Sequence, residues 1–482
     1  MSFYLAVDLG TTGCRSIIFD SKLKQIAWAY EEYGLITPKE KWVEQDAELW
    51  WQLTKSTAKS AIAKAGIPGS EIKGISISSQ GITIVPVDKN IKPLCNAISW
   101  LDSRAEAETE EIGRDFGEEK IFFLTGKPLL TAYTLPKLIW LMRNCKEIYE
   151  SAYKILMPLD FLTAKFTGEC VTDYSMASGT LMYDLKGKCW AGEILDRYGI
   201  DEEKLPRIAE GGECVGKVRT EVARELGLSA DCTVSLGAQD QKCAAHGAGL
   251  CDGVMTVSLG TAVAVTKLWR EAKTEINNGV GWCGYTERDA YVTEGVINTA
   301  GTCLRYVRDL MFANEKYDVI DKEAEQARKR GSSLIFHPYL SGPSAPDFYD
   351  GSIGNFYGVN LATERGDYAL AVMEGIAFGI RRLLEAMEAY GNVHTLVLFG
   401  GGAKSELWCQ IISDVTGMEI KVPSTTEAAG AGAALLAGKG IGDKISPLSY
   451  DSTYVPSMLV GAYEEKYNKY REIEKKLWEI KK

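Results

Sequence analysis

The sequence predicts an α/β protein in which two duplicated domains face each other across a shared cleft. Three observations support this fold class. With 482 residues, the chain exceeds what one ordinary hydrophobic core holds. In both halves, short apolar runs that end in glycine alternate with apolar patterns of helical period. The opening AVDLGTTGCRSII also has a counterpart, TVSLGTAVAVTKL, in the middle of the chain. We place the domain boundary near residue 244, between an N-terminal domain of residues 1–244 and a C-terminal domain of residues 245–482.

The start of the chain predicts a meander of three strands rather than a strand–helix–strand unit. Apolar runs at Phe3–Asp8, Arg15–Asp20 and Ile26–Tyr33 are separated by turns at Gly10–Gly13 and Ser21–Lys24. A helix and a buried strand follow the meander. Residue Asp46 is a favourable helix N-cap, and the apolar stripe after it ends at Gly66 and Pro68. The run Ile75–Ser78 then predicts a strand.

The middle of the chain repeats the opening pattern. The runs Val254–Ser258 and Val263–Thr266 flank the turn Leu259–Ala262, so each half contains a strand that ends in Leu-Gly-Thr. Two interpretations remain open at this point. The two segments are either unrelated hairpins with glycine turns or copies of one domain, each presenting a small-residue turn to a shared cleft.

The last third of the chain is typical of an α/β domain. Strand Leu396–Phe399 leads into the loop Gly400–Gly402, and Ser405 is positioned to cap the next helix. A helix near Glu427–Ala437 is rich in Gly and Ala, which allows close approach of another backbone. The C-terminal helix carries an apolar face that we expect to pack on the domain body. This face consists of Tyr463, Tyr467, Tyr470, Ile473, Leu477 and Ile480.

Composition favours a globular protein whose partners are small molecules. Hydrophobic residues make up 46% of the chain, charged residues 25%, and the formal net charge is −11. An acidic surface repels nucleic acids and anionic membranes, so we expect neither as a partner. No apolar run is long enough to span a bilayer, the N-terminus lacks a signal-peptide pattern, and twelve cysteines include no C-x-x-C pair. We expect a cytoplasmic protein, with a homodimer as the assembly to test.

A small-residue turn near the N-terminus suits phosphate binding. In Asp8-Leu9-Gly10-Thr11-Thr12-Gly13, glycines let backbone N–H groups approach an anion, and the threonine hydroxyls add donors. The carboxylate of Asp8, at the end of a buried strand, suits Mg²⁺ beside phosphates. The alternative is a glycine hairpin with a capping aspartate. The loop Gly400–Gly402 is a weaker nucleotide signal, because many such turns bind nothing; no P-loop or dinucleotide fingerprint is present.

A second carboxylate is positioned for proton transfer. A strand ends at Gly237, Asp240 follows in the loop, and small residues then open a helix. Placed at or near this helix N-terminus, Asp240 is expected to be ionised at neutral pH and able to take a proton from a hydroxyl that attacks phosphorus. The alternative is a simple N-cap. Polar and aromatic groups at Ser78–Gly81 and Trp100–Arg104 suit a sugar, although Asp102 and Arg104 also fit a structural ion pair.

Taken together, these segments resemble the FGGY carbohydrate kinases, over about residues 3 to 440. The matching segments include DLGTTGCR, KWVEQD, NAISWLDSRA, KLIWL, GAQDQ, SLGTA, AGTCLRYVRD, GNFYGVNL, VMEG and LVLFGGGAKSELW. The resemblance implies two duplicated actin-like (ribonuclease H-like) domains with an interdomain catalytic cleft that closes on Mg²⁺ and ATP. It implies Asp240 as the catalytic base and Asp8 as the metal-associated residue. It implies ATP binding by Thr11, Thr12, Gly13, Arg15, Thr261, Gly301, Arg305, Gly401, Gly402 and Glu406. On the sugar side it implies Gln80, Gly81, Ile82, Trp100, Asp102, Asp240 and Gln241.

The chain departs from this family at the sugar side. Glycerol kinases carry Arg-Glu, and well-known xylulokinases Met-His, where this chain has Gly81-Ile82. The expected function is transfer of the γ-phosphoryl group of ATP to a small sugar, with a pentulose such as xylulose as the first candidate. The alternatives are a glycerol or tetritol kinase and a non-catalytic actin-like or chaperone-like ATPase.

Overall fold

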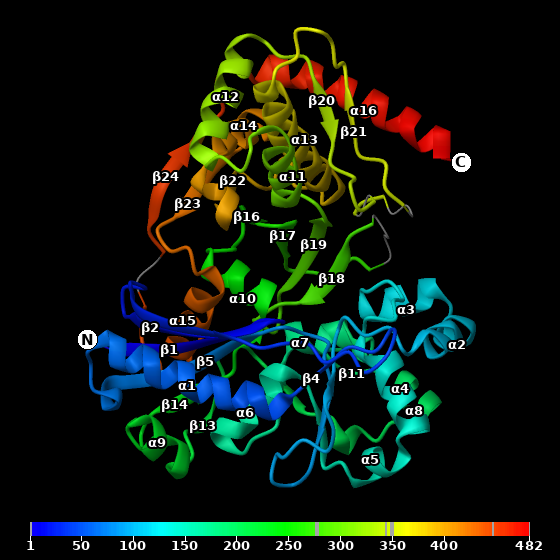
Figure 1. The fold of residues 1–482 in the computed structure, drawn as a ribbon. Helices are drawn as coiled ribbons and strands as arrows, with labels where there is room; N and C mark the ends of the chain where they lie inside the picture. Colours follow the sequence, from blue (N-terminus) through cyan, green and yellow to red (C-terminus); the bar gives the residue numbers. More distant parts are fainter. Residues whose placement is uncertain (1, 275–278, 343–344, 348–350, 446–447, 482) are drawn as a thin grey trace.

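The computed structural model describes residues 2–274, 279–342, 345–347, 351–445 and 448–481. Two seven-stranded sheets dominate it, one in each half of the chain (Figure 1). The first sheet has the order β13-β14-β5-β1-β2-β3, with β15 beside β5. Its strands are β1 (Phe3–Leu9), β2 (Gly13–Asp20), β3 (Gln25–Glu32), β5 (Ile72–Ser79), β13 (Cys214–Lys217), β14 (Thr233–Ser235) and β15 (Ala238–Gln239). The meander predicted for residues 3–33 is therefore confirmed.

The second sheet repeats the topology of the first. Its order is β18-β19-β17-β16-β22-β23-β24. In each sheet, the first strand of a hairpin (β1 of β1–β2, β16 of β16–β17) pairs with a parallel strand (β5 or β22). A second parallel strand (β14 or β23) follows, and an antiparallel strand (β13 or β24) forms the edge of the sheet on that side. The strands are β16 (Val254–Leu259), β17 (Val263–Trp269), β18 (Gly281–Gly284), β19 (Tyr291–Ile297), β22 (Thr395–Phe399), β23 (Glu419–Pro423) and β24 (Tyr450–Tyr454). This equivalence decides for duplicated domains over two unrelated hairpins.

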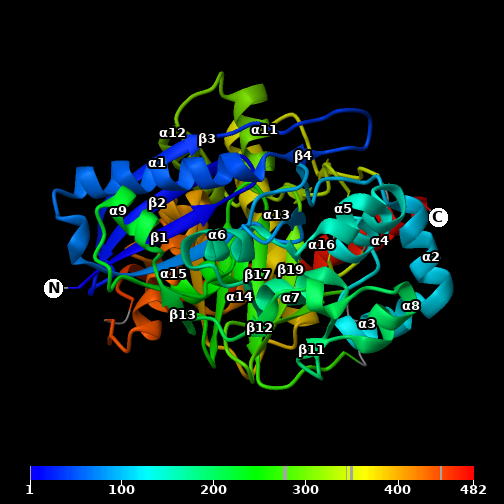
Figure 2. The ribbon, with the colours of Figure 1, turned by 90° about the horizontal axis from the view of Figure 1, so that it is seen from below.

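The predicted helix ends follow the expected local chemistry. Helix α1 (Ala47–Ala65) begins after Asp46, whose carboxylate accepts the N–H groups of Glu48 and Leu49 at 2.9 and 3.3 Å. It ends at Gly66, which has φ = 67°. Helix α14 (Glu406–Thr416) is capped by Ser405, as predicted. Helices α1 and α6 (Pro158–Thr167) cover the outer face of the first sheet (Figure 2).

Two helices lie between the sheets and join the halves (Figure 1). Helix α15 (Ala428–Gly440) comes from the second half but packs on β1 and β2 of the first sheet, whereas α10 (Asp240–Gly247) packs on β22 of the second. They cross closely: a Cβ on Gly247 would lie 1.9 Å from the carbonyl oxygen of Ala428, and one on Gly432 would lie 1.9 Å from that of Cys243. The close approach predicted for α15 is confirmed. The predicted boundary at residue 244 falls inside α10.

A helical region flanks the first sheet and reaches the second half. Figure 2 shows it beside the sheet, built from α2 (Glu106–Phe116), α3 (Glu118–Thr125), α4 (Thr134–Asn144), α5 (Lys146–Ser151) and α8 (Gly192–Tyr198). Its hydrophobic core includes Trp282 and Tyr291 from the second half. The backbone N–H of Trp282 donates to the carbonyl of Gly126 at 2.8 Å. This region therefore forms a bridge between the halves on one side of the molecule.

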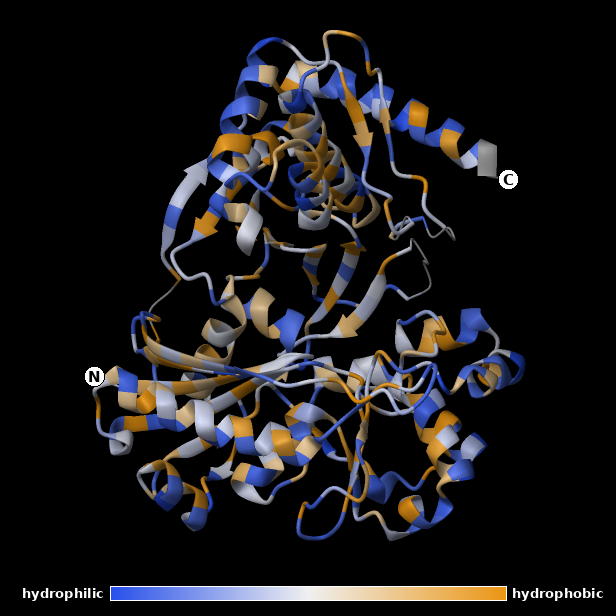
Figure 3. Cartoon of the chain, viewed as in Figure 1, coloured by the Kyte–Doolittle hydropathy of each residue, from blue (hydrophilic) through white to orange (hydrophobic). Residues whose placement is uncertain are grey.

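Around the second sheet, α13 (Arg365–Ala386) forms the centre of the larger core. Helices α11 (Gly301–Met311), α12 (Tyr317–Lys329) and α14 pack around it. The C-terminal helix α16 (Val460–Lys481) alternates apolar and polar residues (Figure 3) and buries Tyr463, Tyr467 and Tyr470 against this core, as predicted. The side chain of Ile480 lies outside the described part. Among the described residues, no helix combines the length and apolarity needed to cross a membrane.

Candidate active site

Three parallel strands of the first sheet end at one edge and bring the predicted catalytic groups together. In the strand register, Asp8 of β1 lies opposite Ser78 of β5, and Ser78 lies opposite Ala238 of β15, two residues before Asp240. The Ser78 hydroxyl donates to the Asp8 carboxylate at 2.9 Å. Ligands of open α/β sheets bind at the carboxyl ends of the strands, so this edge is the expected floor of a site.

The carboxyl of Asp240 differs from the prediction in its electrostatics. It begins α10 and accepts the backbone N–H of Gln241 at 2.7 Å and the side-chain amide of Gln239. We expected the helix N-terminus to hold this group ionised. Instead, burial, followed by the nearby charge of Asp8, raises the pKa of Asp240 to about 7. Loss of solvent outweighs the helix end here. A pKa near neutrality suits a general base that must accept a proton and later release it.

The carboxyl of Asp8 is the predicted metal-associated group. Burial raises its pKa, and the charge of Glu427 adds to this, while Ser78 and Arg15 act in the opposite direction. The charge of Asp8 in turn raises the pKa of Asp240, and two neighbouring carboxyls attract a cation. Within the described residues, no cluster of three or more His, Cys, Asp or Glu side chains could hold a metal alone. Mg²⁺ fits such a site, because it uses one or two carboxylates together with water and phosphate oxygens.

The turn between β1 and β2 is held from both sides. The Thr11 carbonyl accepts the side-chain amide of Gln45 at 2.7 Å, and its hydroxyl accepts the indole N–H of Trp100 at 3.0 Å. Thr12 is exposed at the tip. Gly13 does not have a positive φ. A side chain is nevertheless excluded there, because its Cβ would meet the ring of Tyr30 within 2.5 Å.

The guanidinium of Arg15 faces the other half of the chain. It forms an ion pair with Glu427, the residue before α15, and lies 5.3 Å from the ring centroids of both Trp28 and Tyr30. This predicted ATP-binding side chain therefore ties the first sheet to α15.

A cavity of about 530 Å³ in the second half contains most of the other predicted ATP-binding residues. Thr261, Gly301, Arg305, Gly401 and Gly402 line it. Glu406 lies just outside, at the start of α14. The sequence arguments missed further lining residues. Tyr317, Asp318 and Asp321 lie on α12, which carries no nucleotide motif, whereas Lys404 and Trp408 lie inside the quoted segment LVLFGGGAKSELW.

The predicted sugar side contains two buried oxygens that lack partners among the described residues. Gln80, 2% exposed, donates to the Gln45 side chain at 2.9 Å, but its own Oε1 accepts nothing. The Oε1 of Gln239 is also unpartnered. Gln239 packs against Gly81: a Cβ added to Gly81 would lie 3.1 Å from the Cγ of Gln239. Ile82 follows with φ = 60°, and Gln241 is half-buried. Buried acceptors need donors, and sugar hydroxyls supply them.

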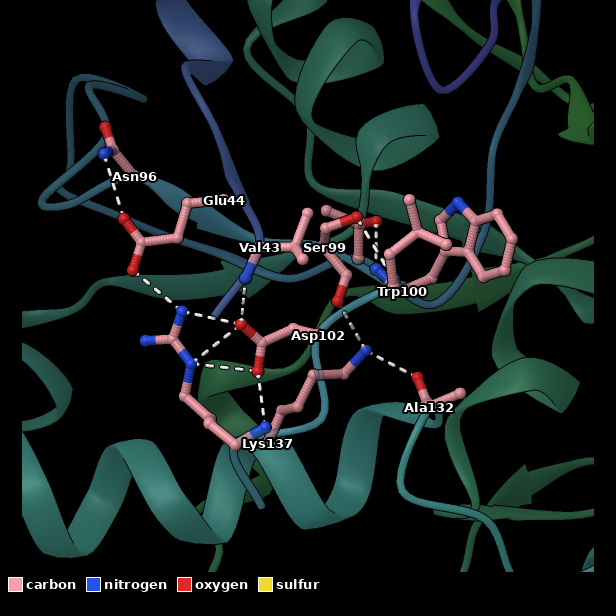
Figure 4. A network of polar contacts seen from close by, with 11 residues as sticks. Val43, Glu44, Asn96, Ser99, Trp100, Asp102, Ala132 and Lys137 are labelled. Atoms are coloured by element: carbon pink, nitrogen blue, oxygen red, sulfur yellow. Dashed lines mark hydrogen bonds and ion pairs between the residues drawn. The ribbon is translucent and has the colours of Figure 1, made fainter. Parts of the chain in front are cut away.

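One predicted sugar ligand has a structural role instead. Figure 4 shows the Asp102 carboxylate inside an ion-pair network. It accepts the backbone N–H of Val43 at 2.6 Å and that of Arg104 at 2.9 Å, and the Arg104 guanidinium at 2.7 Å. Arg104 also pairs with Glu44 at 2.8 Å. The lone pairs of Asp102 are thus occupied, and the ion-pair alternative is correct. Trp100 beside it stays 36% exposed.

The sequence arguments missed three lysines and a glutamate near this site. Lys137, fully buried, donates to the carbonyls of Ser99 and Ala132 at 3.0 and 2.5 Å, which fixes the segment leading into Trp100 (Figure 4). Burial lowers its pKa to about 7. Lys242 pairs with Glu294 of β19 at 2.9 Å, and Lys127 contacts the thiol of Cys283. Lys137 begins the quoted segment KLIWL and Lys242 directly follows GAQDQ, whereas no quoted segment contains Lys127 or Glu294.

Comparison with known proteins identifies the family of this chain. Residues 3–247 match the N-terminal domain of the FGGY family of carbohydrate kinases, and residues 255–441 match its C-terminal domain. A xylulose kinase of Bacillus subtilis is 30% identical over 444 residues, 92% of this chain and 89% of that protein. A gluconokinase of the same organism is 29% identical over 90% of this chain and 87% of its own length.

Solved structures show the same arrangement of domains. The ligand-bound xylulose kinase of Lactobacillus acidophilus superimposes with a TM-score of 0.89 at 25% identity, covering 99% of this chain and 98% of that one. The two topologically equivalent sheets with a site between them are those of the actin-like, ribonuclease H-like fold. The chain therefore belongs to the FGGY family of carbohydrate kinases, ATP-dependent enzymes that transfer a phosphoryl group to an alcohol.

Proposed function

We propose that this kinase phosphorylates a small open-chain sugar, with a pentulose such as xylulose as the first substrate to test. The observation that carries the proposal is the placement of Asp240, with a pKa near 7, beside the two unfilled acceptors of Gln80 and Gln239. A polyhydroxy acceptor satisfies both amide oxygens and presents a further hydroxyl to Asp240. Gly81 and Ile82 add no charge, which suits an acceptor longer than glycerol.

The reaction follows from these groups. A carboxylate oxygen of Asp240 accepts the proton of the sugar hydroxyl while that oxygen forms a bond to the γ-phosphorus of ATP and the bond to ADP breaks. The cavity lined by Thr261 and Gly401 holds the nucleotide, and the turn at Thr11–Gly13 contacts its phosphates. Asp8 would hold Mg²⁺, which neutralises phosphate charge. Keeping water out of the cleft protects ATP from hydrolysis.

The choice of a pentulose rests on the relatives. Several similar proteins are named xylulose kinases, but gluconokinases match almost as well. Overall similarity therefore does not choose between a neutral sugar and a sugar acid.

All twelve cysteines are unpaired, which supports a reducing cytoplasm as the location. A homodimer stays a prediction.

A screen of ADP release tests the proposal. Purified protein with Mg²⁺ and ATP is offered pentuloses, hexuloses, tetritols and glycerol in turn. We expect the largest stimulation with a pentulose, and a product carrying one phosphate per ADP formed. If glycerol or a tetritol gave the highest kcat/KM, the pentulose assignment would be wrong.

A further inference from the structure

An unusually short sulfur contact joins a lysine and a cysteine from the two halves of the chain. The Nζ of Lys127, which follows α3, lies 2.6 Å from the Sγ of Cys283 in β18. Both residues are buried, with exposed fractions of 8% and 2%. In the described part of the chain, the other hydrogen bonds of cysteine sulfurs measure 3.2 to 3.8 Å. The contact between Lys127 and Cys283 is therefore far shorter than its counterparts.

An ordinary hydrogen bond does not account for this separation. Bonds from N–H to oxygen are about 2.7 to 3.2 Å long, and sulfur is a larger atom than oxygen, so a bond from N–H to sulfur is longer still. The ammonium of Lys242, for comparison, lies 2.9 Å from an oxygen of Glu294. A direct N–S bond would hold the two atoms much closer than 2.6 Å. The observed separation matches two single bonds through one oxygen atom, N–O–S.

The surrounding backbone holds the two side chains against each other. The residues just before them are joined, because the Gly126 carbonyl accepts the backbone N–H of Trp282 at 2.8 Å. Among the described residues, the Lys127 ammonium has no hydrogen-bond partner other than Cys283, and a thiol is a weak acceptor. The nitrogen and sulfur are thus positioned for reaction and not held by stronger partners.

We propose that Lys127 and Cys283 are a modification site at which dioxygen joins them through a covalent N–O–S bridge. One N–O and one O–S bond form, while one N–H bond of the amine, the S–H bond and the O–O bond break. Nitrogen and sulfur each lose two electrons, and dioxygen takes up the four. Its second oxygen atom leaves as water with the two released hydrogens. Dioxygen is small enough to enter by local opening of the structure, so the reaction needs no ligand cavity.

The bridge would connect the halves of the molecule covalently. Lys127 belongs to the helical region beside the first sheet, and Cys283 lies 156 positions later, in the second sheet. A cross-link that closes so long a loop restricts the unfolded chain and stabilises the folded protein. Two equivalents of a dithiol return the four electrons and restore the amine and the thiol, so the bridge is reversible. This inference does not depend on the proposed substrate.

Mass spectrometry of the full-length protein tests the bridge. Protein purified without oxygen and with dithiothreitol should have the unmodified mass, and exposure to air should add about 14 Da, for one oxygen gained and two hydrogens lost. Tryptic digestion of the air-exposed protein should give residues 121–137 linked to residues 274–288. Dithiothreitol should separate the two peptides. It should also lower the Tm of air-exposed wild type.

Matched variants assign the link to these two side chains. Lys127→Arg keeps the positive charge and Cys283→Ser keeps the size, and neither should give the linked peptide or a Tm that responds to dithiothreitol. Cys251→Ser, at an exposed cysteine, should keep both. Separate peptides from air-exposed wild type, with oxygen on Cys283 alone or on neither residue, would overturn the proposal in favour of a hydrogen-bonded pair. A link that lacks the added oxygen, or that persists in Lys127→Arg, would overturn it as well.

Discussion

At the scale of single residues, the carboxyl of Asp240 is the group that we propose accepts the hydroxyl proton and so determines the chemistry. In Asp240→Asn the amide keeps the shape and the contact with Gln241, but it cannot accept a proton. We expect sugar phosphorylation to fall by about 10²- to 10⁴-fold, with ATP binding retained. Steady-state ADP release and calorimetry with a non-hydrolysable ATP analogue measure the two properties. A variant with more than half of wild-type turnover would contradict the assignment.

The raised pKa of Asp240 also makes the stability of the folded protein depend on pH. Its pKa rises from 3.8 to about 7 on folding, so the folded protein holds a proton that the unfolded chain releases between these values. Stability is therefore lost as pH rises through this window. We expect Asp240→Asn without ligands to gain in Tm over the wild type at about pH 8, and the gain to disappear near pH 4. An equal difference at both values would mean that the pKa of Asp240 is not raised.

Turnover by the wild type should depend on the titration of the same carboxyl. The base acts when deprotonated, so kcat/KM for the sugar should fall about tenfold per pH unit below pH 7 and level off above it. A profile that stays flat down to pH 5, measured with saturating ATP, would place the essential pKa elsewhere.

Residues whose roles depend on local chemistry were predictable, and those that depend on tertiary surroundings were not. Asp46 and Ser405 cap helices as expected, because a cap involves only neighbouring residues. We expected the helix end to keep the pKa of Asp240 low, but burial and the charge of Asp8 raise it to about 7. Asp102 was assigned to the sugar, yet Val43 and Arg104 occupy its carboxylate.

At the scale of elements, the proposed nucleotide cavity depends on a close approach between the turn after β16 and the start of α11. The backbone N–H of Gly301 donates to the Gly260 carbonyl at 3.0 Å, and a Cβ on Gly301 would lie 2.5 Å from that oxygen. We expect Gly301→Ala to push the two elements apart and to raise KM for ATP severalfold more than KM for the sugar. Gly216→Ala, where a Cβ meets nothing within 4 Å, is the control. Equal changes in both constants would point to general destabilisation.

The strands and turns of both sheets were predictable because apolar runs and glycines mark them directly. The arrangement of α10 and α15 between the sheets was not, although the small residues of α15 indicated a close contact. Which backbone it meets depends on residues such as Gly247 and Gly432, nearly two hundred positions apart. The helical bridge was also unexpected, since its core includes Trp282 from the other half of the chain.

At the scale of the whole molecule, the residues of the proposed site are divided between the two halves. The first sheet supplies Asp8, the turn at Thr11–Gly13 and Gln80, whereas the second half supplies the cavity lined by Thr261 and Gly402. The turn at Thr11–Gly13 does not line that cavity in this structure. In the proposed reaction, both sets contact one ATP molecule. The halves are already joined on one side, where Gly126 accepts the N–H of Trp282.

We therefore expect the halves to close when both substrates bind, with α10 and α15 between the sheets as the region that transmits the motion. Closure brings the phosphate turn to the nucleotide and excludes water. It also prevents loss of ATP to hydrolysis, because the sugar helps to complete the site. Small-angle scattering should give a smaller radius of gyration with sugar plus a non-hydrolysable ATP analogue than without ligands, and an intermediate or unchanged value with the analogue alone. Superimposable curves at saturating ligand would show that the cleft does not close, and small loop movements would then have to complete the site.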